Sequence, residues 1–251
     1  MDHDTNIGGA SYRFPDTSHS AIIAAHSDSH EVRRTALETI VTAYWKPVYK
    51  YLRLKFQLSN EDAKDLTQAF FATLIEKHYL DSFDSTKGSF RTFLRTCLDR
   101  FAANQYKHDH RDKRGGEVQL MSLDFDVAEQ ELAQVAGSPT LSPEEHFQRE
   151  WVRSLFMLAT ETLRQHYESQ NRSIYFQLFE LYDLNDNAAE EKLSYSSLAK
   201  QFSLTEQDVT NYLAAARRKF RQIVLDKLRE LTANDDEFRA EARALLGWTK
   251  A

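Results

Sequence analysis

The sequence predicts an all-α protein with two small helical domains joined by an acidic linker. Only seven glycines and four prolines occur in 251 residues, where average usage would be about 12% for the two together. Folds that need many tight turns are therefore disfavoured. No Gly or Pro occurs between Glu144 and Leu246, and apolar residues recur at helical spacing along most of the chain.

Changes of composition and charge divide the chain into five segments. The first is polar and expected to be flexible, and the next two are a helical domain and an acidic linker. A second domain then contains a helix-turn-helix, and a C-terminal amphipathic helix follows it. We place these segments at residues 1–17, 18–116, 117–141, 142–231 and 232–251.

In the first domain, apolar spacing predicts a helix from Val32 to about Phe56, which Pro47 should kink or restart. Ser59 is the expected N-cap of the next helix, with Asp62 three residues later. A further helix begins near Phe90, because Phe90, Phe93, Leu94, Cys97, Leu98 and Phe101 form an apolar stripe.

In the second half, Ser142-Pro143-Glu144-Glu145 combines an N-cap Ser, an early Pro and two acids, which predicts a helix start. Another helix is expected over about Ser173–Leu184. The linker is expected to hold a helical turn around Val127–Leu132. The C-terminal helix could dock on the second domain or bind a regulator.

The net charge of −6 hides a strong local asymmetry. Residues 87–114 carry eight Lys/Arg against three Asp, and residues 205–229 carry six against three acids. Between them, residues 115–150 carry one Arg against eight acids. Two basic blocks separated by an acidic one indicate a partner with negative charge, and the acidic linker could cover a basic face when the chain is free.

The most specific local pattern is a helix-turn-helix over Leu193–Val224. A short helix from Tyr195 leads through Phe202-Ser203-Leu204 to a helix that starts at Thr205. In such motifs the second helix enters the major groove, with polar residues near its start facing base edges and basic residues facing phosphates. The plain alternative is a helical hairpin with a solvated basic face. The expected DNA-facing residues are Thr210, Asn211, Ala214, Arg217, Arg218 and Arg221.

Two further patterns lie in the first domain. The helix from Phe90 combines basic and aromatic residues, a mixture suited to phosphates and unpaired bases, although most of its aromatics are expected in the core. Asp62, Asp65 and Gln68 share one polar stripe on the helix after Ser59. A solvated helix face is the plain alternative for that stripe.

Enzymatic chemistry is not indicated. No phosphate-binding glycine motif is present, and no cofactor is implied. His108 and His110 point apart on a helix and have no third metal ligand, so no metal site is predicted. Cys97 is expected to be a small core residue. We see neither a signal peptide nor an apolar run of membrane-spanning length, so a cytoplasmic protein is expected.

Five motifs, in order, are similar to those of a known family. They are Tyr-Trp-x-Pro-Val-Tyr at 44–49, Asp-Leu-Thr-Gln-x-Phe-Phe at 65–71, Gly-x-Phe-Arg-x-Phe-Leu at 88–94, Lys-Arg-Gly-Gly at 113–116 and Ser-Pro-Glu-Glu-x-Phe-x-Arg-x-Trp at 142–151. On these the chain resembles bacterial RNA polymerase sigma factors of the sigma-70 family, extracytoplasmic-function (ECF) group.

The resemblance implies a non-enzymatic transcription initiation factor whose partners are core RNA polymerase and promoter DNA, with an anti-sigma factor as a further candidate. The domains at 18–116 and 142–231 would correspond to sigma regions 2 and 4. The core-polymerase motif falls on Asp62, Asp65, Gln68 and Phe71. The minus-ten segment falls on Arg100, Asn104, Lys107, His108 and Arg111. The recognition helix for the minus-thirty-five element carries the six residues of the helix-turn-helix named above.

Two alternatives remain open at this point. One is a helix-turn-helix regulator that binds duplex DNA without polymerase, and the stripe at Asp62–Phe71 argues against it. The other is an interaction protein built from helical hairpins, which salt-sensitive DNA binding would exclude.

Overall fold

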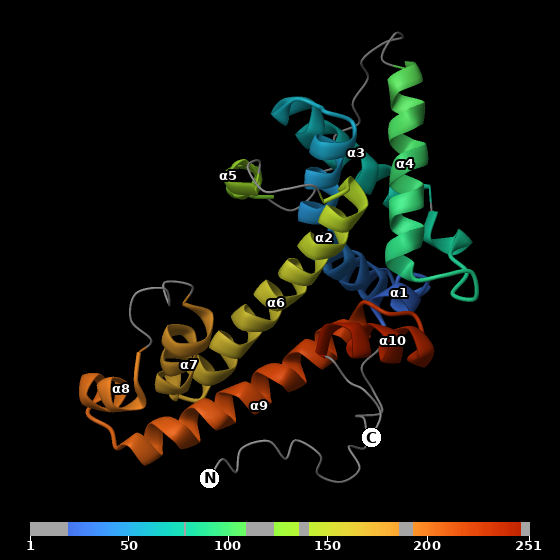
Figure 1. Ribbon diagram of the computed structural model, residues 1–251. Helices are drawn as coiled ribbons and strands as arrows, with labels where there is room; N and C mark the ends of the chain where they lie inside the picture. Colours follow the sequence, from blue (N-terminus) through green and yellow to red (C-terminus); the bar gives the residue numbers. More distant parts are fainter. Residues whose placement is uncertain (1–19, 78, 109–122, 136–140, 186–192, 247–251) are drawn as a thin grey trace.

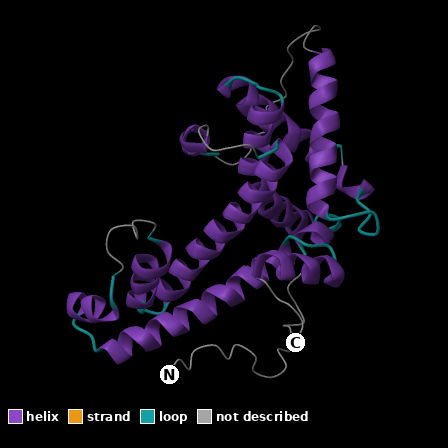
Figure 2. Ribbon diagram, in the orientation of Figure 1, coloured by secondary structure: helices purple, strands orange, loops and turns teal. Residues whose placement is uncertain are grey.

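The computed structural model describes residues 20–77, 79–108, 123–135, 141–185 and 193–246. Within these ranges every regular element is a helix and no strand occurs (Figures 1 and 2), which confirms the predicted all-α class. In chain order the elements are α1 (Ala21–Ala24), α2 (His30–Lys55), α3 (Asn60–Glu76), the 3-10 turn η1 (Tyr79–Ser82), α4 (Phe90–His108), α5 (Phe125–Val135), α6 (Pro143–Ser169), α7 (Ser173–Phe179), the π-helical turn η2 (Glu180–Leu184), α8 (Tyr195–Phe202), α9 (Glu206–Glu230) and α10 (Asp235–Leu246).

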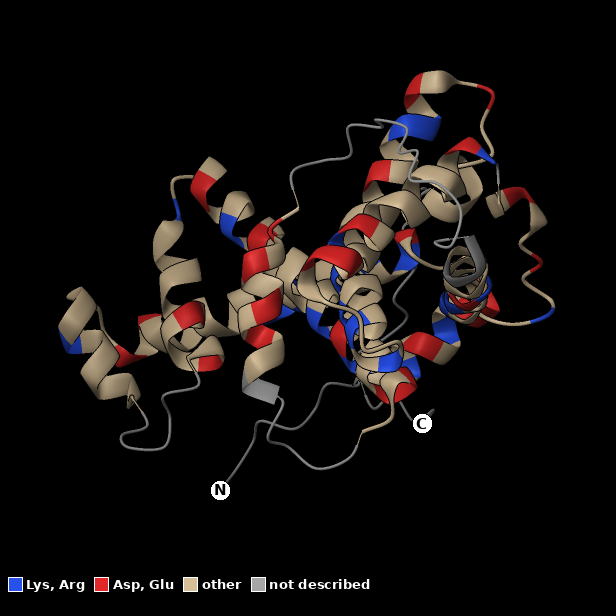
Figure 3. Ribbon diagram, turned by 90° about the horizontal axis from the view of Figure 1, so that it is seen from above, with Lys and Arg blue, Asp and Glu red and all other residues tan. Residues whose placement is uncertain are grey.

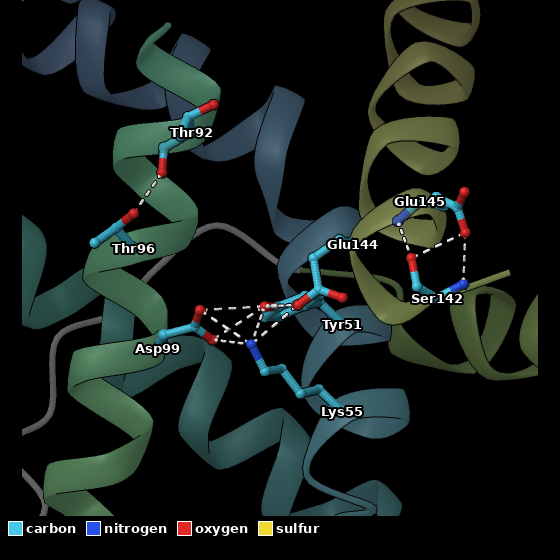
Figure 4. Close-up of polar contacts among 8 residues, drawn as sticks. All are labelled: Tyr51, Lys55, Thr92, Thr96, Asp99, Ser142, Glu144 and Glu145. Atoms are coloured by element: carbon cyan, nitrogen blue, oxygen red, sulfur yellow. Dashed lines mark hydrogen bonds and ion pairs between the residues drawn. The ribbon is translucent and has the colours of Figure 1, made fainter. Parts of the chain in front are cut away.

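Side-chain caps start several helices at the residues that the sequence predicts. The Ser142 hydroxyl accepts a hydrogen bond from the Glu145 amide at 3.2 Å, and the Glu145 carboxylate accepts one from the Ser142 amide at 2.8 Å (Figure 4). Thr205 and Asp208 form the same reciprocal box at the start of α9. Such caps satisfy amides that have no partner inside the helix.

Two elements differ from the expectation. Helix α2 is one unbroken element through Pro47, so the proline does not restart the helix, and Tyr44 and Val48 on either side of it are fully buried. The expected turn in the linker is the complete helix α5, whose ends extend beyond the predicted residues.

Helix α6 is central, because it packs on elements from both halves of the chain (Figure 1). Its first half faces α2, where Trp151 lies 6.4 Å from Tyr44 and Phe147 lies 5.6 Å from Tyr51 between ring centres. Its later turns face α7 and α9. The buried apolar side chains accordingly form one continuous cluster from α1 to α10. The division of the chain into domains at residues 18–116 and 142–231 stays a prediction. Apolar side chains of the two predicted domains pack against each other, as α2 and α6 show.

The C-terminal helix α10 docks beside the start of α4. Glu237 accepts hydrogen bonds from the amides of Phe90 at 2.8 Å and Ala233 at 2.9 Å, so it caps the first turn of α4. Arg91 and Glu241 form an ion pair at 2.6 Å, with side chains only 14% and 13% exposed. The Arg91 guanidinium also lies 4.1 Å from the centre of the Trp151 ring. The extension therefore contacts the first half of the chain as well as α9.

We predict that Glu241→Ala lowers the free energy of unfolding by about 3 kcal/mol, because it leaves the Arg91 charge buried without its carboxylate. Urea denaturation followed by circular dichroism measures the change. Asp236→Ala is the matched control, since that side chain on the same helix is 98% exposed, and it should change stability by less than about 0.5 kcal/mol. Equal stability of the two variants would contradict this account of α10.

Candidate polymerase and nucleic-acid interface

Helix α3 presents the predicted polar stripe to solvent. Asp62, Asp65 and Gln68 are all exposed, while Phe70 and Leu74 on the opposite face are buried. The Asp62 carboxylate also accepts a 2.6 Å hydrogen bond from the Ser59 hydroxyl at the start of the helix. The stripe is thus free to contact a partner without any loss of core packing.

Phe71, predicted on the same contact surface, is placed differently. Its side chain is fully buried and packs edge-on against Phe70, with 5.3 Å between ring centres. In this conformation it cannot touch a partner directly. Its contribution is to hold α3 against the core, because fully burying such a side chain stabilises the fold by about 1.5–3 kcal/mol.

Helix α4 exposes part of the predicted minus-ten segment. The side chains of Arg100 and Asn104 face solvent. Lys107 and His108 occupy the last turn of the helix, and nothing of their side chains is described. Arg111 lies outside the described residues.

A polar network fixes α4 against α2 and α6 immediately before Arg100. The Lys55 ammonium lies 3.0 Å from the Asp99 carboxylate and 3.1 Å from the Glu144 carboxylate, and the Tyr51 hydroxyl donates to Asp99 at 3.0 Å (Figure 4). Four groups from three helices therefore set the position of this part of α4.

Sequence reasoning missed a hollow of about 500 Å³ beside Arg100. It lies between α4 and the segment that precedes this helix. Cations and aromatic rings line it, together with Asp84, which pairs with Lys87 at 3.0 Å. Aromatic rings beside a cation suit an unpaired base and its phosphate. The signal available in the sequence was the aromatic and basic content of residues 83–93. The lining includes Phe83, Lys87, Phe93, Thr96, Cys97 and Arg100.

Cys97 is half-buried, and burial raises the pKa of its thiol. The thiol is therefore neutral at pH 7 and a poor nucleophile. Among the described residues no group of three or more His, Cys, Asp or Glu side chains is arranged to hold a metal ion.

Helix α8, a short turn and the first half of α9 cover the residues predicted to form a helix-turn-helix. Ser203 adopts the left-handed conformation with φ of 56° at the end of α8, and this reverses the chain before Thr205 caps α9. Leu198, Val209 and Leu213 are fully buried between the two helices. The apolar positions therefore lie where the motif requires them.

The DNA-facing candidates on α9 do not share one environment. Thr210, Asn211, Arg218 and Arg221 are exposed, and Ala214 is half-buried. Arg217 instead pairs with Asp183 at 2.9 Å, which raises the pKa of the guanidinium. Its charge is thus already partnered within the protein.

The comparisons with known proteins agree with the geometry of the first half. Residues 40–112 match the model of the family described as Sigma-70 region 2. This match covers less than a third of the chain. No match was found among curated proteins or among solved structures.

The Sigma-70 region 2 match includes both α3 and α4, and it supports a sigma-70 family factor. Sigma-70 factors are transcription initiation factors and not enzymes, and their region 2 binds core RNA polymerase and promoter DNA. The helix-turn-helix lies outside the matched residues. No described helix has the length and apolar character needed to cross a membrane.

The acidic helix α5 covers a basic face of α2. Glu131 accepts hydrogen bonds from Lys46 at 3.0 Å and Lys50 at 2.6 Å, and Glu129 accepts one from Arg53 at 3.0 Å. In Figure 3, basic and acidic residues interleave along the central helices. The charge asymmetry of the sequence is thus partly neutralised inside the molecule.

These contacts lower the pKa values of both carboxyl groups. Hydrogen bonding from Arg53 is the main cause for Glu129. Burial alone would raise the pKa of Glu131, but the hydrogen bonds from Lys50 and Lys46 outweigh it. Because their pKa values are lowered, both carboxylates stabilise the docked state of α5 at pH values above their ordinary pKa of 4.5. This stabilisation is lost as the pH falls below that value.

We therefore predict that α5 detaches on acidification below about pH 4.5, before the rest of the protein unfolds. The Trp45 indole, which lies against Phe125 of α5, reports this in a two-dimensional NMR titration. The Trp151 indole in the core is the internal control. Simultaneous changes at Trp45 and Trp151 would contradict separate detachment.

Proposed function

We propose that the chain is a sigma factor that binds core RNA polymerase and directs it to promoters. The region 2 match over residues 40–112 carries this proposal, because within it α3 offers an exposed polar stripe and α4 offers exposed Arg100 and Asn104. In this proposal α3 binds polymerase, α4 reads the minus-ten element and α9 reads the minus-thirty-five element. Membership of the ECF group and control by an anti-sigma factor are part of the same hypothesis.

The hollow beside Arg100 supports a role on melted DNA. A base that leaves the duplex needs an aromatic surface and a neighbouring cation, and Phe93 with Arg100 supplies both. The helix-turn-helix supports a second contact on duplex DNA. A regulator that acts without polymerase would have no use for the α3 stripe.

Run-off transcription with bacterial core RNA polymerase on a promoter library tests the proposal. Transcripts should start at defined promoters only when the chain is present. The free chain should give no sequence-specific gel shift, because its net charge is −6 and an acidic segment lies between its two basic blocks. Tight sequence-specific binding by the free chain, without any stimulation of polymerase, would favour the simple regulator.

We expect Asp65→Ala/Gln68→Ala to weaken association with core polymerase by about tenfold or more, with helicity unchanged. Both side chains are exposed, so their loss should cost within about 0.5 kcal/mol of stability. Competition against a labelled sigma factor measures the affinity. Glu161→Ala/Gln165→Ala likewise removes one carboxylate and one carboxamide, but from α6, and should have no effect. If both pairs behave alike, α3 is not the polymerase surface.

The recognition helix allows base reading to be separated from phosphate binding. Asn211 lies near the start of α9, where a bidentate contact with adenine is worth about 1–3 kcal/mol of discrimination. We predict that Asn211→Ala relaxes base preference at one position of the minus-thirty-five element. Arg218→Ala should instead weaken all promoters alike and reduce the salt slope by about one unit.

The measurement is transcription from a library with every upstream base varied, at two salt concentrations. Asp183→Ala provides a further comparison, because it releases Arg217 from its ion pair and should strengthen binding to all sequences. A changed base preference in Arg218→Ala, with uniform weakening in Asn211→Ala, would show that α9 is rotated relative to this assignment.

A further inference from the structure

We propose that the face of α2 beneath α5 is a binding surface for single-stranded nucleic acid, and that α5 covers it in this conformation. The surface is separate from the two assigned to α4 and α9, so the inference goes beyond the proposed function. It is defined by Trp45, Lys46, Tyr49, Lys50 and Arg53.

The cations of this α2 face form a row. Lys46, Lys50 and Arg53 are spaced by four and three residues, which places them on one side of a helix. Seven residues of helix span about 10 Å, the length of roughly three stacked nucleotides at 3.4 Å each. Lys46 and Lys50 are almost fully buried under α5. Such burial is uncommon for lysine unless an anion lies against it.

Aromatic rings lie beside the row. The Phe125 ring of α5 sits edge-on against Trp45 at 5.4 Å and against Tyr49 at 5.2 Å between ring centres. Departure of α5 would uncover both rings next to the cations. A positive groove with adjacent aromatic side chains is the typical platform for single strands, and each stacked base contributes about 1–3 kcal/mol.

The covering helix itself resembles such a ligand. Residues 125–135 contain three acids and no Lys or Arg. Glu129 and Glu131 pair with the cations of α2, and Asp126 lies 3.6 Å from Lys64 of α3. One aromatic ring and two carboxylates thus occupy the positions of a base and its neighbouring phosphates.

The contact between α5 and α2 is weak enough for α5 to undock. The helix has eleven residues, a length that is marginal for an isolated helix. Among the apolar side chains described between residues 125 and 133, only Phe125 and Ala128 are buried, and Val127 is 38% exposed. Lys50 keeps a second carboxylate, Glu150 of α6 at 2.8 Å, so undocking does not leave its ammonium without a partner.

The test compares variants of the full chain by fluorescence anisotropy with a labelled single strand of about 12 nucleotides. Glu129→Gln/Glu131→Gln removes the two carboxylates, and it should bind about tenfold more tightly than the unmodified chain. Glu161→Gln/Glu168→Gln makes the same change of charge on α6 and should bind as the unmodified chain does. Adding Lys46→Gln/Arg53→Gln to the first variant should abolish the gain.

Hydrogen exchange of residues 125–135 reports whether α5 has left, and Phe125→Ala is a second route to its release. The proposal is overturned if α5 stays protected in both variants, or if it is released without tighter binding. It is also overturned if the gain survives the loss of Lys46 and Arg53. Equal competition by polyglutamate would assign the α2 face to acidic proteins instead. No polymerase is used, so the outcome is independent of the proposed promoter function.

Discussion

The packing of α6 on α2 is the contact on which the remaining arrangement depends. Trp151 lies against Tyr44 of α2, and the Arg91 guanidinium from the start of α4 covers its ring. Glu241 of α10 then pairs with Arg91. One tryptophan thus connects four helices that are far apart in the sequence. Because the later turns of α6 pack on α7 and α9, the position of α8 and α9 depends on this junction as well.

Charge has two roles in this molecule. Polar and charged side chains on the outer faces of α3, α4 and α9 are exposed. A second set of charged side chains forms ion pairs within the molecule. Lys55, Arg91 and Arg217 each join separate helices through carboxylates. Half-buried pairs of this kind contribute more through the cost of breaking them than through their net attraction. They therefore favour one arrangement of the helices over others, and a count of basic residues overstates the positive surface.

Local signals in the sequence were enough for the helices and their starts, because capping residues and apolar spacing act over a few residues. Ser142 and Thr205 begin their helices as predicted for this reason. Phe71 shows the limit, since a motif indicates that a residue matters but not whether it faces a partner or the core. The pairing of Arg217 with Asp183 joins residues 34 positions apart, and nothing in local spacing specifies it. The docking of α5 and α10 depends on such distant contacts too.

The length and unbroken course of α9 link two distant parts of the molecule. It runs without Gly or Pro from Glu206 to Glu230, a length of about 37 Å at 1.5 Å per residue, and Figure 1 shows it joining α8 at one end to α10 at the other. A helix of this kind has no internal hinge. It packs against α6 along part of its length, where the Phe156 and Phe220 rings stack. A displacement at the α10 end is therefore passed along α9 to the α8 end, so the contact of the C-terminal helix with α4 and the contacts at the start of α9 are mechanically linked.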